Sequence, residues 1–195
     1  ATAGVEENFP QDIAIYDLSE FLGMMSLFNK PTFEFDDKSM TISEEGTSTK
    51  SKYFFADASI LTVPQKDVKM PETVVDIEIT EDTFNELKKA AAVLGVNDLS
   101  ICSTDGSNVL AILSDKNNTS SNTYSIEIGY NEEGNIFNFD FKIDNLRIIP
   151  GNYEVCFAEK IVSQFTNKSF DLTYWVALES SSSFSSNVES NVGAA

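Results

Sequence analysis

Few residues in this chain have the types and spacing that chemistry requires, and Lys88 and Lys89 stand out among them. They are the only adjacent pair of basic residues in a sequence with 13 Lys and Arg against 31 Asp and Glu. A net charge of −18 repels phosphate backbones and argues against broad nucleic-acid binding, but a local basic patch remains open. The alternative, which composition alone favours, is an ordinary solvated helix face.

The residues that catalysis and metal binding use are scarce. The chain has no His, which excludes Ser-His and Cys-His pairs, and no nucleophile-elbow, dinucleotide or phosphate-loop motif. Cys102 and Cys156 lie far apart without a CxxC pattern, so two reduced thiols are favoured over a zinc site. Three acidic clusters fall at turns or on the wet faces of strands, where solvated edges are the favoured interpretation: Asp36-Asp37, Asp76-Glu78 and Glu132-Glu133. We therefore expect no enzyme activity, no cofactor and no metal.

Alternation of apolar and polar residues dominates the chain and predicts strands buried on one side only. The clearest examples are residues 33–36, 75–80, 124–130, 137–143 and 172–178. With 42% hydrophobic residues and 15 Phe, the chain can build a substantial core. No apolar run approaches the roughly 18 residues of a membrane span, so we expect no membrane contact.

Two stretches repeat apolar residues at helical spacing instead. The first follows Asp17, which has Glu20 three residues on, a capping-box arrangement. The second runs over 81–94 between a Thr80 cap and a Gly95 stop. In this second helix Lys89 points nearly opposite the apolar stripe of Phe84, Leu87, Ala91 and Leu94, while Lys88 flanks the stripe. A weaker helical turn is predicted in 142–148.

Three longer segments resemble one known family. They are "FPQDIAIYDLSEFLGMMSLFN", "NIFNFDFKIDNLRIIPGNYEV" and "YWVALES". Together they resemble the sliding clamp of T-even-type tailed phages, the DNA polymerase processivity factor. Their order and spacing agree with the family from about Phe9 to Ser180, which is most of the chain.

The resemblance implies an α+β DNA-clamp fold, with antiparallel sheets outside, few helices on the inner face and two similar domains. It divides the chain into a truncated first domain (1–56), an interdomain connector (57–72), a complete second domain (73–180) and a mobile Ser-rich tail (181–195). Family members begin with a further strand, helix and hairpin, which amount to roughly 40 residues at ordinary element lengths. We therefore expect the first domain to be incomplete.

The resemblance also implies the function. Three subunits would close into a ring around duplex DNA and tether the phage polymerase, without any enzymatic step. The residues expected to face DNA are Lys88, Lys89, Arg147 (on the short second helix) and, more weakly, Lys30. The alternative is a structural all-β phage protein without a DNA role; an unrecognised hydrolase is more distant because His is absent.

Partners and interfaces follow from the same resemblance. Besides DNA and the polymerase, it implies a clamp loader ATPase, late-transcription factors as further candidates, and the host cytoplasm as the location. Partner tails would enter a pocket lined by Val63, Pro64, Met70, Pro71, Tyr174 and Val176; the alternative is that these residues only attach the connector to the core. Subunits would meet between the strand bearing Tyr53 and Phe55 and the neighbour's strand bearing Ile126 and Ile128.

Overall fold

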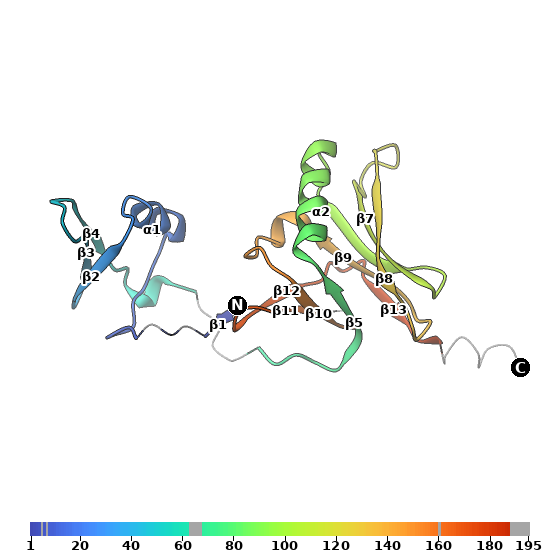
Figure 1. Ribbon diagram of the computed structural model, residues 1–195. Helices are drawn as coiled ribbons and strands as arrows, with labels where there is room; N and C mark the ends of the chain where they lie inside the picture. Colours follow the sequence, from blue (N-terminus) through green and yellow to red (C-terminus); the bar gives the residue numbers. More distant parts are fainter. Residues whose placement is uncertain (5, 7, 63–67, 160, 188–195) are drawn as a thin grey trace, which may run out of the picture. The chain divides into compact units, whose positions relative to one another are not determined.

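The computed structural model describes residues 1–4, 6, 8–62, 68–159 and 161–187, which form two compact units (Figure 1). The large unit consists of the described residues of Ala1–Val5 and Val68–Ala195. The small unit consists of those of Glu6–Asp67.

In the small unit, one helix packs on a three-stranded antiparallel sheet. The elements are α1 (Leu18–Met25), β2 (Pro31–Asp36), β3 (Ser39–Glu44), β4 (Lys50–Phe54) and the short 3₁₀ helix η1 (Ala58–Ile60). The sheet order is β2-β3-β4, so β4 is an edge strand. The carboxylate of Asp17 accepts a hydrogen bond from the Glu20 N–H at 2.9 Å, which confirms the predicted helix start. The buried core is small: Phe28, Met40, Ile42 and Tyr53.

The large unit contains two five-stranded antiparallel sheets. Its strands are β1 (Thr2–Ala3), β5 (Thr73–Ile79), β6 (Asp98–Ser103), β7 (Asn108–Ser114), β8 (Tyr124–Tyr130), β9 (Ile136–Lys142), β10 (Tyr153–Ala158), β11 (Val162–Asn167), β12 (Leu172–Ala177) and β13 (Ser183–Ser185). One sheet has the order β1-β12-β11-β10-β5 and the other β13-β9-β6-β7-β8. The helices are α2 (Glu81–Leu94), which joins β5 to β6, and the 3₁₀ helix η2 (Ile143–Asn145).

Alternation along the strands sends one set of side chains into the core of the large unit. Phe137, Phe139 and Phe141 all point inward from β9, and Phe139 stacks on Phe157 of β10 with the ring centroids 4.4 Å apart. Fully burying one such side chain contributes roughly 1.5–3 kcal/mol. Helix α2 adds its buried residues to this same core, so the core fixes which face of α2 stays outside.

Two expectations about the ends of the described chain were wrong. The first residues were assigned to the first domain, but Thr2 and Ala3 pair with β12 and so belong to the large unit. The Ser-rich tail was expected to be mobile from residue 181, but β13 pairs with β9 and Phe184 packs against the core. Composition misled here because one apolar side chain and several serine hydroxyls suffice to attach a short strand.

A buried carboxylate holds this last strand in place. Asp140 on β9 is 1% exposed and forms an ion pair with Lys116. Its carboxylate also accepts hydrogen bonds from the hydroxyls of Ser100 at 2.7 Å and Ser181 at 2.5 Å. Burial alone would raise the pKa of Asp140, but these bonds outweigh burial and hold that pKa below its ordinary value.

Candidate nucleic-acid interface

Helix α2 is fixed at both ends. The Thr80 hydroxyl accepts a hydrogen bond from the Thr83 N–H at 3.2 Å, and the Glu81 N–H donates to the Asn152 side chain at 2.9 Å. Gly95 ends the helix with φ +67°, a left-handed conformation that glycine adopts without strain. The predicted range 81–94 is confirmed.

The two lysines have different environments. Lys89 is exposed. Lys88 is half-buried, and its Nζ lies 4.3 Å from the centroid of the Phe84 ring, one turn earlier on the helix. Burial lowers the pKa of Lys88. Lys88 therefore covers part of the core with its stem and presents its charge beside an aromatic ring.

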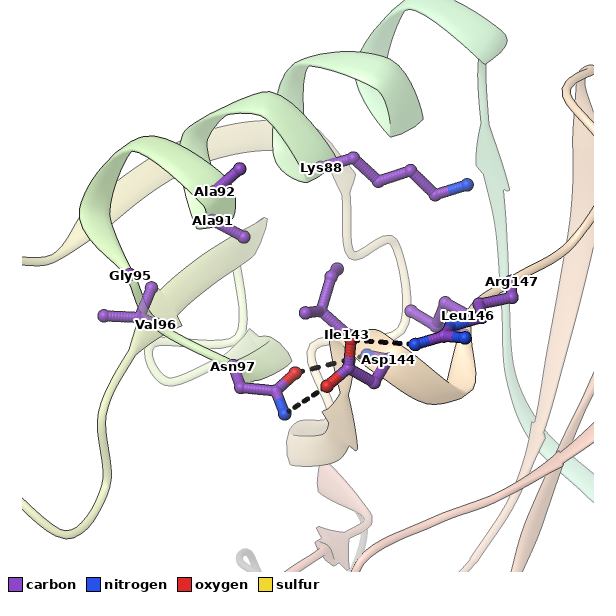
Figure 2. Close-up of a pocket in the computed structure, with 10 residues that line it drawn as sticks. All are labelled: Lys88, Ala91, Ala92, Gly95, Val96, Asn97, Ile143, Asp144, Leu146 and Arg147. Atoms are coloured by element: carbon purple, nitrogen blue, oxygen red, sulfur yellow. Dashed lines mark hydrogen bonds and ion pairs between the residues drawn. The ribbon is translucent and has the colours of Figure 1, made fainter.

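Lys88 and Arg147 line one cavity of about 490 Å³ (Figure 2). The cavity lies between the second half of α2 and the η2 segment, and its apolar lining includes Ala91, Val96 and Leu146. Arg147 was expected on the short helix; it instead follows the capping residue Leu146 and is exposed, because the helix is only three residues long.

The opposite wall of the cavity is polar and rigid. The Asn97 amide donates to the Asp144 carboxylate at 2.9 Å, and the Asp144 N–H donates back to the Asn97 side chain at 3.2 Å (Figure 2). Arg147 forms an ion pair with Asp144 at 3.7 Å between Nη2 and Oδ1. Sequence reasoning missed Asn97 and Asp144, which are 47 residues apart, so no local pattern connects them.

Helix α2 has more acidic than basic residues. The helix carries Glu81, Asp82 and Glu86 besides its two lysines. The two acids of the first turn complement the helix dipole, and the Glu86 carboxylate accepts a hydrogen bond from the Tyr124 hydroxyl. Lys88 and Lys89 can contact phosphate oxygens without reading bases. The geometry suits weak, sequence-independent contact with an anionic backbone.

Lys30 and the proposed partner pocket are placed elsewhere. Lys30 is exposed just before β2 in the small unit. Val63 and Pro64 lie outside the described residues. Val176 is buried in the core of the large unit, so naming it as a pocket residue was wrong: it faces its own core rather than a partner.

The other proposed pocket residues do not meet. The Tyr174 hydroxyl accepts a hydrogen bond from the Ile149 N–H at 3.2 Å, which ties the β12 side chain to its own unit. Met70 and Pro71 precede β5, and β10 and β11 lie between β5 and β12 in the sheet. The pocket thus stays a prediction for Met70 and Pro71 and for Val63 and Pro64, which lie outside the described residues.

The two strands expected at the subunit interface are both edges of their sheets. Tyr53 is buried and Phe55 packs in the small core, while Ile126 and Ile128 pack against the large core. These four side chains point into their own units. What β4 and β8 offer to a neighbour is therefore their free main-chain edges and their outward faces.

The described part of the chain offers few side chains for nucleophilic or metal chemistry. Burial, followed by a hydrogen bond to Asp76, raises the pKa of the Cys156 thiol to about 12. Burial also raises the pKa of Cys102. Among the described residues no three acidic or cysteine side chains gather as metal ligands, and no helix is long and apolar enough to cross a membrane.

Comparison with known proteins identifies similar chains. The family model described as "gp45 sliding clamp, C terminal" matches residues 76–180. The sliding clamp of Vibrio phage KVP40 is 28% identical over 183 residues, covering 92% of this chain and 81% of that protein. The sliding clamp of Enterobacteria phage T4 is 28% identical over 163 residues, covering 80% of this chain and 69% of that protein.

Solved structures show the same fold at low sequence identity. The Helicobacter pylori β clamp matches with a TM-score of 0.60 at 14% identity, covering 82% of this chain and 45% of that one. The proliferating cellular nuclear antigen of Entamoeba histolytica matches with a TM-score of 0.57 at 12% identity, covering 84% and 70%. The sheets and helices described above are therefore those of the DNA-clamp fold.

Proposed function

The chain belongs to the gp45 sliding clamp family, and on that premise we propose that it is a sliding clamp of phage DNA replication. It encircles duplex DNA as part of a ring and tethers the replicative DNA polymerase, which makes the polymerase processive. The observation that carries the proposal is the family match over residues 76–180, the segment that contains α2 and most of both sheets of the large unit. A structural phage protein without a DNA role has no observation in its favour.

The geometry of α2 fits the way such a ring works. A closed ring stays on DNA because it is threaded, so its contacts can be weak. Lys88, Lys89 and Arg147 supply a few phosphate contacts on an otherwise acidic chain, and weak contacts let the ring slide. No bound group has to react, so the proposed role needs neither an enzymatic step nor a cofactor.

The assembly and its partners extend the same proposal. Three copies close the ring through the edges of β4 and β8. A clamp loader ATPase opens and places the ring, and late-transcription factors are further candidate partners. The protein works in the cytoplasm of the infected bacterium. Lys30 and the segment with Met70 and Pro71 remain candidate contacts for DNA and for partner tails.

The proposal is tested by asking whether the protein is held on circular DNA as a closed ring. The protein is loaded by the phage clamp loader and ATP onto a nicked circular plasmid, separated from free protein by gel filtration, and the plasmid is then cut once. We expect the protein to stay on the circle and to leave after the cut, because a ring slides off a free end. Equal retention on cut and uncut plasmid would show ordinary binding and would refute the ring.

A further inference from the structure

Six of the described strands lie at the ends of their sheets, namely β1, β2, β4, β5, β8 and β13, among them β4 in the small unit and β8 in the large unit. Unpaired edges are templates for another strand. Both strands alternate. Tyr53 points inward from β4, and Tyr124, Ile126 and Ile128 pack against the core from β8.

The outward faces of the two strands carry opposite charges. Lys50, Lys52 and Phe54 are exposed on β4, which thus holds two of the 13 basic residues in five positions. Glu127 is exposed on β8, and the sequence from 117 to 141 contains no Lys or Arg.

Neither side of this charge pair is strongly engaged within its own unit. Among the described residues Glu127 forms no ion pair. Lys52 approaches Asp36 at 3.6 Å, but both side chains are at least half exposed, and such a surface pair contributes little. Both groups are therefore free to pair with another copy.

The lengths of the strands restrict how they can pair. β4 has five residues and β8 has seven. In its pairing with β7, β8 shifts register at Ile128, so it is regular only from Tyr124 to Glu127. A one-residue slip turns every side chain to the other face, so the inward Tyr53 must stand opposite an inward residue. In the regular part of β8 only Tyr53 opposite Ile126 meets this condition with both neighbours of Tyr53 also paired, because Tyr53 opposite Tyr124 would leave Phe54 beyond the end of β8.

That register sets Lys52 opposite Glu127. We propose that copies of this chain join β4 to β8 in this one register and that a Lys52–Glu127 ion pair between copies selects it. The inference rests on the proposed function, because it describes the contact that closes the ring. A slip by two residues keeps the faces but leaves one end of β4 unpaired.

Charge gives this contact its specificity. Two copies with a net charge of −18 each repel one another, and none of the other terminal strands, β1, β2, β5 and β13, contains a Lys or Arg that could offset this repulsion. The β4–β8 contact is an exception because a basic strand meets an acidic one. Opposite charges that face each other across strands attract, and like charges there are destabilising.

The test is a charge exchange. Self-association of the full chain is measured by sedimentation velocity over a range of concentrations for wild type, Lys52→Glu, Glu127→Lys and the double variant. Each single change replaces an attractive pair with a repulsive one and should weaken association by about tenfold per interface. The double variant restores an attractive pair and should associate like wild type. Lys69→Glu, which changes net charge as Lys52→Glu does but alters an exposed residue that lies on neither β4 nor β8, should also resemble wild type.

The outcomes separate this inference from the function. Single variants that associate like wild type, or a double variant no better than the singles, overturn the register while the ring stands. Wild type that stays monomeric at every concentration overturns the ring and the inference together. Thermal melting followed by circular dichroism establishes that each variant is folded, which is expected because all three positions are exposed.

Discussion

Lys88 and Lys89 are adjacent in sequence, yet truncating them should have different effects on stability. From sequence alone, both changes to Ala would cost within about 0.5 kcal/mol of unfolding free energy, as exposed helix positions usually do. That expectation holds for Lys89, which is exposed in the structure. Lys88, half-buried with its Nζ 4.3 Å from the Phe84 ring, should lose more.

The size of the loss follows from two contacts. The cation over the Phe84 ring contributes about 0.5–1 kcal/mol at a partly exposed site. The buried stem of Lys88 adds to this, but burial also penalises the charge, as the lowered pKa of Lys88 shows. We therefore expect Lys88→Ala to cost about 1 kcal/mol. Lys88→Met keeps the stem, loses the charge and its penalty, and should fall within about 0.5 kcal/mol of wild type.

Urea denaturation measures these differences. Trp175, the single tryptophan of the chain, lies on β12 in the large unit that contains α2, so its fluorescence reports on that unit. Lys89→Ala is the matched control because it has the same chemistry on the same helix. Equal losses for the two Ala variants, or a Lys88→Met variant as unstable as Lys88→Ala, would refute the placement of Lys88 over Phe84.

Three further predictions concern function, the buried carboxylate and pH. Changing both Lys88 and Lys89 to Glu should shorten products in a primer-extension assay, most at low salt where screening is weakest; unchanged lengths with loading intact would make these lysines a solvated face. Asp140→Ala should lower the unfolding free energy in urea by about 3 kcal/mol, because Lys116 and the serine hydroxyls lose their buried partner. Adding Lys116→Met should recover part of this loss, and a double variant whose loss is the sum of the two single losses would contradict the coupling. In the folded chain the pKa of Asp140 is below its ordinary value of 3.8, so the ionised carboxylate stabilises the fold above that pH, and this stabilisation is lost as the pH falls through the lowered pKa. The unfolding free energies of Asp140→Asn and wild type, measured against pH, should therefore converge only below about pH 3.8. A constant difference down to lower pH would contradict the lowered pKa.

Local patterns predicted the helices well. The start of α1 at Asp17, the start of α2 at Thr80 and its end at Gly95 each depend on residues within four positions of one another. The inward and outward faces of the strands follow equally local alternation. The shortage of positive charge on α2 was also visible in the sequence, since three acids and two lysines share the helix.

Features that depend on distant residues could not be predicted in this way. The Asn97–Asp144 pair and the attachment of Ser181 to Asp140 join residues about forty positions apart. The pocket assignment of Val176 failed for a different reason. The alternation over residues 172–178 predicts that its apolar face is buried, and the resemblance to the family was followed instead. Arg147 was misplaced because a single 3₁₀ turn has no periodicity that fixes its end.

The low reactivity of the two native thiols makes the chain convenient for labelling at an introduced cysteine. Burial raises the pKa of the Cys156 thiol to about 12, so this thiol is almost entirely protonated at pH 7, and Cys102 is buried as well. A cysteine introduced at an exposed position away from the proposed contact between copies, such as Thr119 between β7 and β8, would be thiolate in a few per cent of molecules. A maleimide dye should therefore react at the introduced site without removal of the native cysteines, and single-molecule fluorescence could follow the movement of the protein along DNA.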